Sequence, residues 1–262
     1  MAAQRPGRRS HGWAIAIGLA LVILVAGCGD GSRPAAGRRT TPTPTTSPAP
    51  VTAPSSTSSS TTAPTTSASS TTTVAKPPPP PGLVDVQELE PSIVVALNKL
   101  TSDNFTGEPL PGYEANRAFL TPQAGEALAA AQRRLARSGL GLKVYDAYRP
   151  ARATRAMVAW ARSQGRGDLV GPYIASVSYH NSGQAVDLTL VELGTDRELD
   201  MGTAYETFTP AAHTVNATGV VAANRAALVG AMHAEGFANY EGEWWHFNYL
   251  VPGASILDAP VR

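Results

Sequence analysis

A long stretch of the chain lacks the residues needed to build a hydrophobic core. From Gly29 to Pro81 it consists almost entirely of Ser, Thr, Pro, Ala and Gly, with no aromatic residue. Such a segment cannot bury enough apolar surface to offset the entropy lost on ordering, so residues 28–81 are expected to form a disordered stalk. The Pro77–Pro81 run predicts a short, stiff polyproline spacer at its end. Folded structure is therefore expected in residues 82–262, a length that suits one domain with one core.

The N-terminal residues have the layout of a secretory signal. Arg5, Arg8 and Arg9 precede an uncharged apolar run, Trp13–Ala26, that is short for a membrane span. The run leads into the sequence LVAGC, whose last residue is Cys28, and this resembles the lipobox of bacterial lipoproteins. We therefore expect residues 1–27 to be a lipoprotein signal peptide and Cys28 to be lipidated. A signal anchor, or an ordinary secretory signal with an incidental cysteine, is the alternative.

Charge divides the chain near the same point. Seven basic residues and one acidic residue precede Gly82, whereas 14 basic and 19 acidic residues lie from Gly82 onward. The basic residues of the stalk suit an anionic membrane surface. The folded part has no basic stripe of the kind that binds nucleic acid, so no nucleic-acid partner is expected. Together with the lipobox, this predicts an extracytoplasmic protein that a lipid anchor holds on the bacterial cell membrane.

Local signals in residues 82–262 predict helices interleaved with strands. Helices are expected where capping residues and helical periodicity coincide, at residues 121–137, 150–163 and 222–234. Strands are expected at residues 142–147, 184–191 and 244–250. In the second strand, Val186, Leu188 and Leu190 share one face, and Asp187 lies on the other. This order favours an α+β domain with a central, mostly antiparallel sheet flanked by helices.

Two motifs carry the candidate chemistry. The first, SYHNSGQAVD, runs from Ser178 to Asp187, and the second, EWWH, runs from Glu243 to His246. Two histidines and an aspartate can form the three-ligand set of a catalytic zinc. A buried histidine beside one aspartate is more often a satisfied polar pair than a metal site. The joint occurrence of His180, Asp187, His246 and Glu243 favours the metal.

The spacing within each motif requires a turn. A separation of seven puts His180 and Asp187 on opposite faces of a regular strand, so the chain must turn between them, and the sequence NSG at 181–183 can supply that turn. Glu243 and His246 are three residues apart, so both reach one site only if Glu243 lies in a loop or at a bulge.

The two motifs together resemble a known family. Ser-x-His-x-x-Gly-x-Ala-x-Asp, followed by Glu-x-Trp-His, is similar to the zinc D-alanyl-D-alanine dipeptidases of the vancomycin-resistance type, within the wider group of D-Ala-D-Ala metallopeptidases. The similarity extends to DNFTG at 103–107, DAYRP at 146–150 and MGT at 201–203. It covers nearly all of the folded part and none of the stalk. It implies a hedgehog-like D,D-peptidase fold with one Zn²⁺ per chain.

The resemblance also implies the role of each site residue. His180, Asp187 and His246 would bind zinc, Glu243 would be the catalytic base, and Arg149 would stabilise the transition state. These roles agree with elementary chemistry, because a carboxylate can move the proton of the attacking water to the departing amine. A fixed guanidinium can likewise counter the charge that develops on the carbonyl oxygen.

Two further residues are candidates for substrate binding. In the family that the chain resembles, an acidic residue a few positions after Met-Gly contacts the substrate ammonium, and Glu206 occupies this place. The usual residue there is Asp, so the longer side chain is expected to reshape the pocket and leaves the exact substrate open. Ser178 is the second candidate, and a purely structural role explains it equally well.

These features predict a lipid-anchored zinc dipeptidase that hydrolyses D-Ala-D-Ala or a similar D,D-dipeptide in cell-wall peptide turnover. One alternative is a D,D-carboxypeptidase or endopeptidase that uses the same zinc site on longer peptidoglycan stem peptides. The other is a surface lipoprotein that binds wall fragments without cleaving them, although the complete ligand set and Glu243 argue against it.

Overall fold

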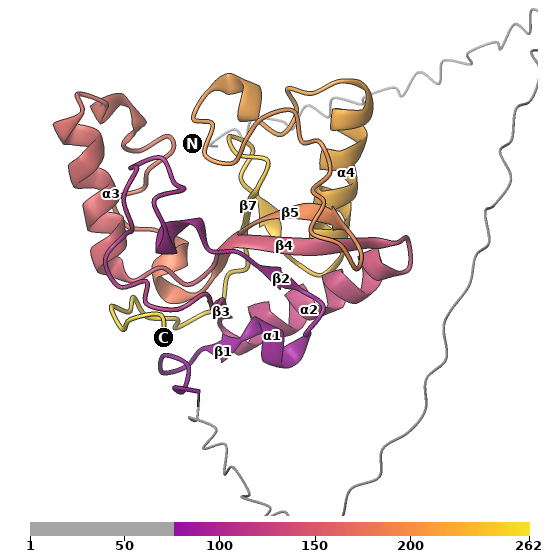
Figure 1. The fold of residues 1–262 in the computed structure, drawn as a ribbon, viewed down its shortest axis with the longest axis horizontal. Helices are drawn as coiled ribbons and strands as arrows, with labels where there is room; N and C mark the ends of the chain where they lie inside the picture. Colours follow the sequence, from indigo (N-terminus) through magenta and orange to yellow (C-terminus); the bar gives the residue numbers. More distant parts are fainter. Residues whose placement is uncertain (1–75) are drawn as a thin grey trace, which may run out of the picture. The chain divides into compact units, whose positions relative to one another are not determined.

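A mixed sheet forms the centre of the computed structural model, which describes residues 76–262 (Figure 1). Its five strands follow the order β2-β4-β5-β7-β6, and only the β2–β4 pair is parallel. The strands are β2 (Val94–Val95), β4 (Leu140–Asp146), β5 (Ala185–Glu192), β6 (Ala238–Asn239) and β7 (His246–Asn248). The expected signal peptide, Cys28 and most of the expected stalk lie outside the described residues.

Helices cover this sheet and extend beside it. The helices are α1 (Val86–Leu89), α2 (Pro122–Ala136), α3 (Ala151–Ser163) and α4 (Gly219–Ala234). Helix α2 packs on β4 and contacts α4, which in turn contacts β5 and β6. Helix α3 stands apart from α2 and α4 in Figure 1. A small antiparallel pair, β1 (Val84–Asp85) with β3 (Phe119–Leu120), completes an α+β domain of the expected kind.

The central strands are buried on both faces. Val186, Leu188 and Leu190 of β5 alternate into the buried hydrophobic cluster that includes Leu128 of α2 and Leu228 of α4. The opposite face of β5 is also buried, including the charged residue Asp187, which is 3% exposed. A carboxylate at such a position needs specific partners, so this face of the sheet is where a functional site is expected.

The predicted long elements are confirmed with small shifts, and the last strand is shorter than expected. Helix α2 ends one residue before the predicted limit at Arg137, and β5 is displaced by one residue from the predicted range. The strand expected at 244–250 covers only His246–Asn248, because Trp244 and Trp245 lie in the turn that precedes it. The two-residue strands were not predicted, because so short a segment shows no periodic pattern.

The folded domain begins before the boundary expected at Gly82. Lys76 Nζ donates to Asp85 Oδ2 at 2.6 Å, and Arg117 Nη1 donates to the carbonyl of Pro77 at 2.7 Å. Pro80 is buried. The end of the polyproline run is therefore docked on the domain, and the expected limit of the stalk at Pro81 moves upstream.

The strand register brings Asp146, Asp187 and His246 together on the sheet. Residues that face each other in an antiparallel pair point to the same side, and Asp187 of β5 faces His246 of β7. On the other edge of β5, the register shifts by one residue between Val144 and Asp146, which makes Tyr145 the extra residue of a bulge. The bulge sets Asp146 opposite Asp187.

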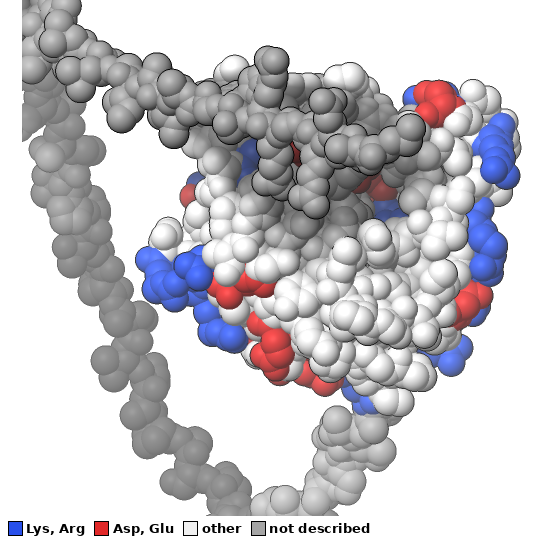
Figure 2. Space-filling model, turned by 180° about the vertical axis from the view of Figure 1, so that it is seen from behind, with Lys and Arg blue, Asp and Glu red and all other residues white. Residues whose placement is uncertain are grey.

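Charged groups of both signs occur on the outer surface. On the face seen in Figure 2, Lys and Arg side chains lie toward the edges with Asp and Glu side chains beside them, and much of the area between them is uncharged. Within residues 76–262, no helix combines the length and the apolar character needed to cross a bilayer.

Gly183 ends the turn that leads into β5, and we predict that it tolerates no side chain. Its φ is +67°, and a Cβ would lie 2.6 Å from Leu83 Cδ2 and 3.2 Å from the backbone nitrogen of Thr121. Gly183→Ala should therefore lower the free energy of unfolding by about 2–4 kcal/mol, as measured by urea denaturation.

Gly139→Ala is the matched control. Gly139 has a similar φ of +72°, but a Cβ at this position would have nothing within 4 Å of it. This variant should lose only the roughly 1 kcal/mol that a left-handed alanine costs. Equal losses for the two variants would show that the close approach to Leu83 is unimportant.

Candidate active site

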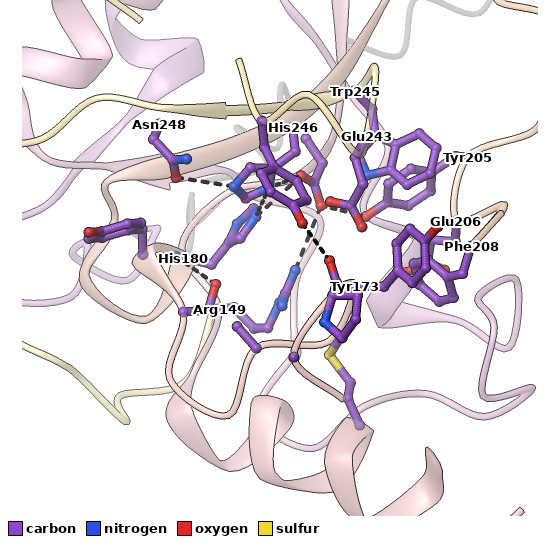
Figure 3. Close-up of a pocket in the computed structure, with 18 of the residues that line it drawn as sticks. Arg149, Tyr173, His180, Tyr205, Glu206, Phe208, Glu243, Trp245, His246 and Asn248 are labelled. Carbon is purple, nitrogen blue, oxygen red and sulfur yellow. Dashed lines mark hydrogen bonds and ion pairs between the residues drawn. The ribbon is translucent and has the colours of Figure 1, made fainter. Parts of the chain in front are cut away.

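One pocket gathers every site residue predicted within the described chain. Its volume is about 240 Å³, and it opens beside β5 and β7 (Figure 3). The seven predicted residues that line it are Arg149, Ser178, His180, Asp187, Glu206, Glu243 and His246. Figure 3 shows Arg149 and Glu243 approaching the histidine pair from different sides. The eighth predicted residue, Cys28, lies outside the described part of the chain.

One ring nitrogen of each histidine makes a hydrogen bond that sets which nitrogen is left for a metal. His180 Nδ1 lies 2.6 Å from the carbonyl oxygen of Ala147, which can only accept, so Nδ1 carries the proton. His246 Nε2 donates to Asn248 Oδ1 at 3.1 Å. Both histidines therefore turn their other ring nitrogen toward Asp187, Nε2 of His180 and Nδ1 of His246.

These two nitrogens and Asp187 Oδ1 form a small triangle. The two nitrogens are 3.2 Å apart, and Oδ1 lies 3.2 Å from His180 Nε2 and 2.9 Å from His246 Nδ1. Ligand atoms bound to tetrahedral zinc at about 2.0–2.1 Å are roughly 3.3 Å apart, so the triangle has nearly the required size. Three lone pairs that converge in this way fit a cation, and the geometry therefore supports one metal ion held by His180, Asp187 and His246.

The protonation of the ligands also suits a metal. Burial lowers the pKa of His180, which favours the neutral imidazole that metals require. Burial acts to raise the pKa of Asp187, but the facing His180 and His246 hold it well below its usual range. Burial lowers the pKa of His246, yet its hydrogen bond with Asp187 leaves it above the usual value. A metal therefore competes with a proton at His246.

The turn between the first two ligands is built by the motif itself. Ser178 Oγ accepts from the backbone nitrogen of His180, and Asn181 Oδ1 accepts from the backbone nitrogen of Ser178, which forms a capping box on the short helix η3 (Tyr179–Ser182). Gly183 then ends η3 in the left-handed conformation. Ser178 thus has a structural role in addition to its place on the pocket wall.

Arg149 is held beside the metal ligands by a buried ion pair. Its Nε and Nη2 lie 2.8 and 2.7 Å from Asp146 Oδ2, and Nη2 is 3.6 Å from Asp187 Oδ2. Burial acts to lower the pKa of Arg149, but Asp146 first among its neighbours keeps it well above the usual value. Asp146 is itself fixed by the hydroxyl of Tyr113, which donates to its Oδ1 at 2.6 Å. A permanent positive charge therefore borders the pocket.

Tyr205 was not predicted from the sequence, yet it contacts a ligand directly. Its hydroxyl donates to Asp187 Oδ2 at 2.8 Å, which leaves Oδ1 to face the two histidines. The ring stacks on Tyr145, with centroids 4.6 Å apart, and meets Trp245 edge to face. Packing on two sides thus fixes a residue that orients the carboxylate.

Glu243 lies in the loop before β7, as its spacing from His246 predicted. Its backbone nitrogen donates to the Tyr240 carbonyl at 3.0 Å, and its own carbonyl accepts from the His246 nitrogen at 3.2 Å. This turn brings both side chains to the same pocket. Burial raises the pKa of Glu243 to about 8, which brings it close to neutral pH, where a carboxyl group can both accept and give up a proton.

Glu206 lines the pocket but is already engaged by the protein. Its Oε1 forms an ion pair with Lys99 Nζ, and its Oε2 accepts from the backbone nitrogen of Phe105 at 3.0 Å. Its φ of 61° makes it the single non-glycine residue with a positive φ among the described residues. No sequence signal pointed to Lys99, which lies more than 100 residues away from Glu206 in the chain.

A three-ligand metal site with a buried glutamate and a fixed arginine in one pocket defines a zinc hydrolase. The family described as D-ala-D-ala dipeptidase matches residues 80–258, and the chain belongs to this family. It is a zinc metallopeptidase.

Relatives named D-alanyl-D-alanine dipeptidase match this chain over most of their own length. The chain is 36% identical over 182 residues to a D-alanyl-D-alanine dipeptidase of Enterococcus faecium, a match that covers 62% of this chain and 89% of the relative. It is 36% identical over 178 residues to that of Streptomyces coelicolor, covering 62% and 88%. For the enzyme of Escherichia coli the identity is 34% over 167 residues, covering 63% and 83%.

Removal of the Tyr205 hydroxyl should weaken zinc binding. Tyr205→Phe leaves Asp187 Oδ2 without its donor, and loss of such a hydrogen bond to a ligand typically costs 10–100-fold in metal affinity, so about this loss is expected. Competition with a chromophoric chelator measures the affinity.

Tyr173→Phe provides the control, because Tyr173 lines the same pocket and its hydroxyl contacts His213 instead of a ligand. Its zinc affinity should match that of the wild type. An unchanged affinity in Tyr205→Phe would show that the hydroxyl does not orient Asp187.

Proposed function

We propose that this enzyme hydrolyses D,D-dipeptides such as D-Ala-D-Ala. The observation that carries the proposal is the convergence of three ligands, Glu243 and Arg149 in one pocket of about 240 Å³, a size suited to a small peptide. Membership of the D-ala-D-ala dipeptidase family supports the same substrate class, as do the names of the relatives.

Each residue has a defined part in the reaction. His180, Asp187 and His246 would hold the zinc, which would supply Lewis-acid activation of a water molecule and lower the pKa of that water toward 7. Glu243 takes the proton from that water and delivers it to the departing amine, a transfer suited to a buried carboxylate whose pKa burial has raised.

Arg149 stabilises the charge that develops on the peptide carbonyl oxygen. Its Nε and Nη2 are occupied by Asp146, and Nη1 donates to no protein group among the described residues. The guanidinium is held in place before the substrate arrives, so no reorganisation is needed as charge develops. Nη1 is the atom best placed to contact that oxygen.

We further propose that the enzyme acts outside the cytoplasmic membrane, where Cys28 anchors it through a lipid. The arginines before the apolar run and the LVAGC sequence support this location. Newly made D-Ala-D-Ala is a cytoplasmic precursor, so an exported dipeptidase is better suited to the turnover of peptides released from the cell wall. The Ser/Thr/Pro-rich stalk would give the domain reach from the membrane.

Glu243→Gln tests the proposed chemistry. The amide cannot accept the proton of the attacking water, so turnover of D-Ala-D-Ala by the zinc-loaded protein should fall by about 10²–10⁴-fold while one zinc per chain is retained. Release of D-alanine measures turnover, and atomic absorption measures zinc.

Glu241→Gln is the matched control, because Glu241 is exposed and lies two residues before Glu243, outside the pocket lining. Its turnover should equal that of the wild type. Substantial activity in Glu243→Gln would refute the assignment of the base, and a zinc-loaded wild type that releases no D-alanine would refute the substrate class.

Cys28→Ala tests the anchor. Without the thiol there is no site for the lipid, so the variant should move from the detergent-rich to the aqueous phase in a detergent partition experiment on cells that express the full chain. Its dipeptidase activity should be retained. Recovery of the wild type in the aqueous phase would contradict the proposed anchor.

A further inference from the structure

Lys99 is a fully buried lysine directly behind the pocket wall. Its side chain is 0% exposed, and it forms an ion pair with Glu206. The ammonium also lies 3.2 Å from the Tyr205 hydroxyl and 4.9 Å from the centroid of the Tyr205 ring. A buried ammonium is costly unless it is paired, so these contacts fix Lys99 in place and couple it to Glu206.

The backbone of Glu206 indicates that this pair is built with some strain. A φ of 61° is unfavourable for a residue with a Cβ, and such conformations persist where the surroundings enforce them. Here both carboxylate oxygens are bound, one by Lys99 and the other by the Phe105 backbone. The carboxylate of Glu206 is therefore fixed, and the buried ammonium of Lys99 balances its negative charge.

In the part of the pocket built by residues 76–262, no carboxylate has an uncompensated charge that is available to a substrate ammonium. Three carboxylates line it, and of these Asp187 is a metal ligand and Glu243 is the proposed base. Glu206 is the third, and Lys99 cancels its charge. Near Glu206 the wall is aromatic, with the rings of Phe208 and Trp245 beside it (Figure 3).

The mouth of the pocket also suits more than a dipeptide. Val177, Tyr179 and Tyr240 line the pocket and are 68%, 50% and 42% exposed. Apolar side chains that are both exposed and part of a pocket wall offer a surface to a ligand that extends out of it. A peptide continued beyond the D,D-dipeptide has such a surface available.

We propose that Lys99 is a specificity-determining residue, which cancels the charge of Glu206 so that the site also accepts D,D-peptides whose amino end is acylated. This inference rests on the proposed hydrolysis of D,D-dipeptides and extends it to the uncharged amino end of a longer peptide. Lys99 acts through Glu206 and does not contact the substrate.

The test compares two ligands on one protein. Dissociation constants of D-Ala-D-Ala and N-acetyl-D-Ala-D-Ala are measured by calorimetry on the zinc-loaded Glu243→Gln protein, in which turnover is suppressed. With Lys99 present, the two should differ by less than about 5-fold, because little net charge faces the ammonium. Adding Lys99→Met should lower the dissociation constant of the free dipeptide by about 10-fold or more. The dissociation constant of the acetylated dipeptide should stay within about 3-fold of its value with Lys99 present.

Two further variants separate charge from structure. Lys143→Met removes the lysine of another pair, with Glu198 at 2.9 Å, that does not line the pocket, and the ratio of the two constants should not change. Lys99→Met with Glu206→Gln replaces the charged pair by a neutral one and should restore the ratio found with Lys99 and Glu206 intact. Because each ratio compares two ligands on one preparation, it is independent of the fraction of folded protein.

Two results would overturn the inference. One is an unchanged ratio in Lys99→Met, and the other is a shift toward the acetylated ligand, which would mean that Lys99 holds Glu206 in place for the ammonium. Failure of the proposed function is distinct from both, since it would appear as absent turnover of both compounds by the wild type while the binding ratios still report on Lys99.

Discussion

The site depends on the pairing of Asp187 with His246 across β5 and β7. The two residues are directly opposite in an antiparallel ladder, so the backbone hydrogen bonds of the sheet set the distance between two of the three ligands. The third ligand, His180, comes from the turn that feeds β5 and is held by the carbonyl of Ala147 at the end of β4. A metal site built in this way is rigid because neighbouring strands determine its geometry.

The bulge in β4 also helps to position the residues around the metal site. By adding Tyr145 to the strand, it sets Asp146 opposite Asp187, and Asp146 then holds Arg149 beside the ligands. The displaced Tyr145 supports the ring of Tyr205, whose hydroxyl orients Asp187. The bulge thus positions both Arg149 and Tyr205, the residue that orients a metal ligand.

Much of the framework could be predicted from local signals. Helix α2 was located by Thr121 and Pro122 at its start, and β5 by the alternation of Val186, Leu188 and Leu190. The turn between His180 and Asp187 followed from their odd spacing together with Gly183. The candidate site residues were found because their chemistry and spacing are specific, and the seven that lie within the described chain all line one pocket.

Other features could not be predicted, because they arise from contacts between distant segments. Lys99 and Glu206 are 107 residues apart, and nothing near Lys99 in the sequence marks it as a buried charge. Tyr205 reaches Asp187 from a turn that lies 18 residues further along the chain. The parallel pairing of β2 with β4 joins residues about 50 positions apart, and two-residue strands carry no period.

The most direct test of this account is the position of the metal. Anomalous diffraction at the zinc edge, on crystals of the protein grown with zinc, should show one peak per chain about 2.0–2.2 Å from His180 Nε2, Asp187 Oδ1 and His246 Nδ1. Absence of the peak, or a metal bound through different atoms of these residues, would contradict the central claim that the β5–β7 pair and the turn before β5 together build a zinc site.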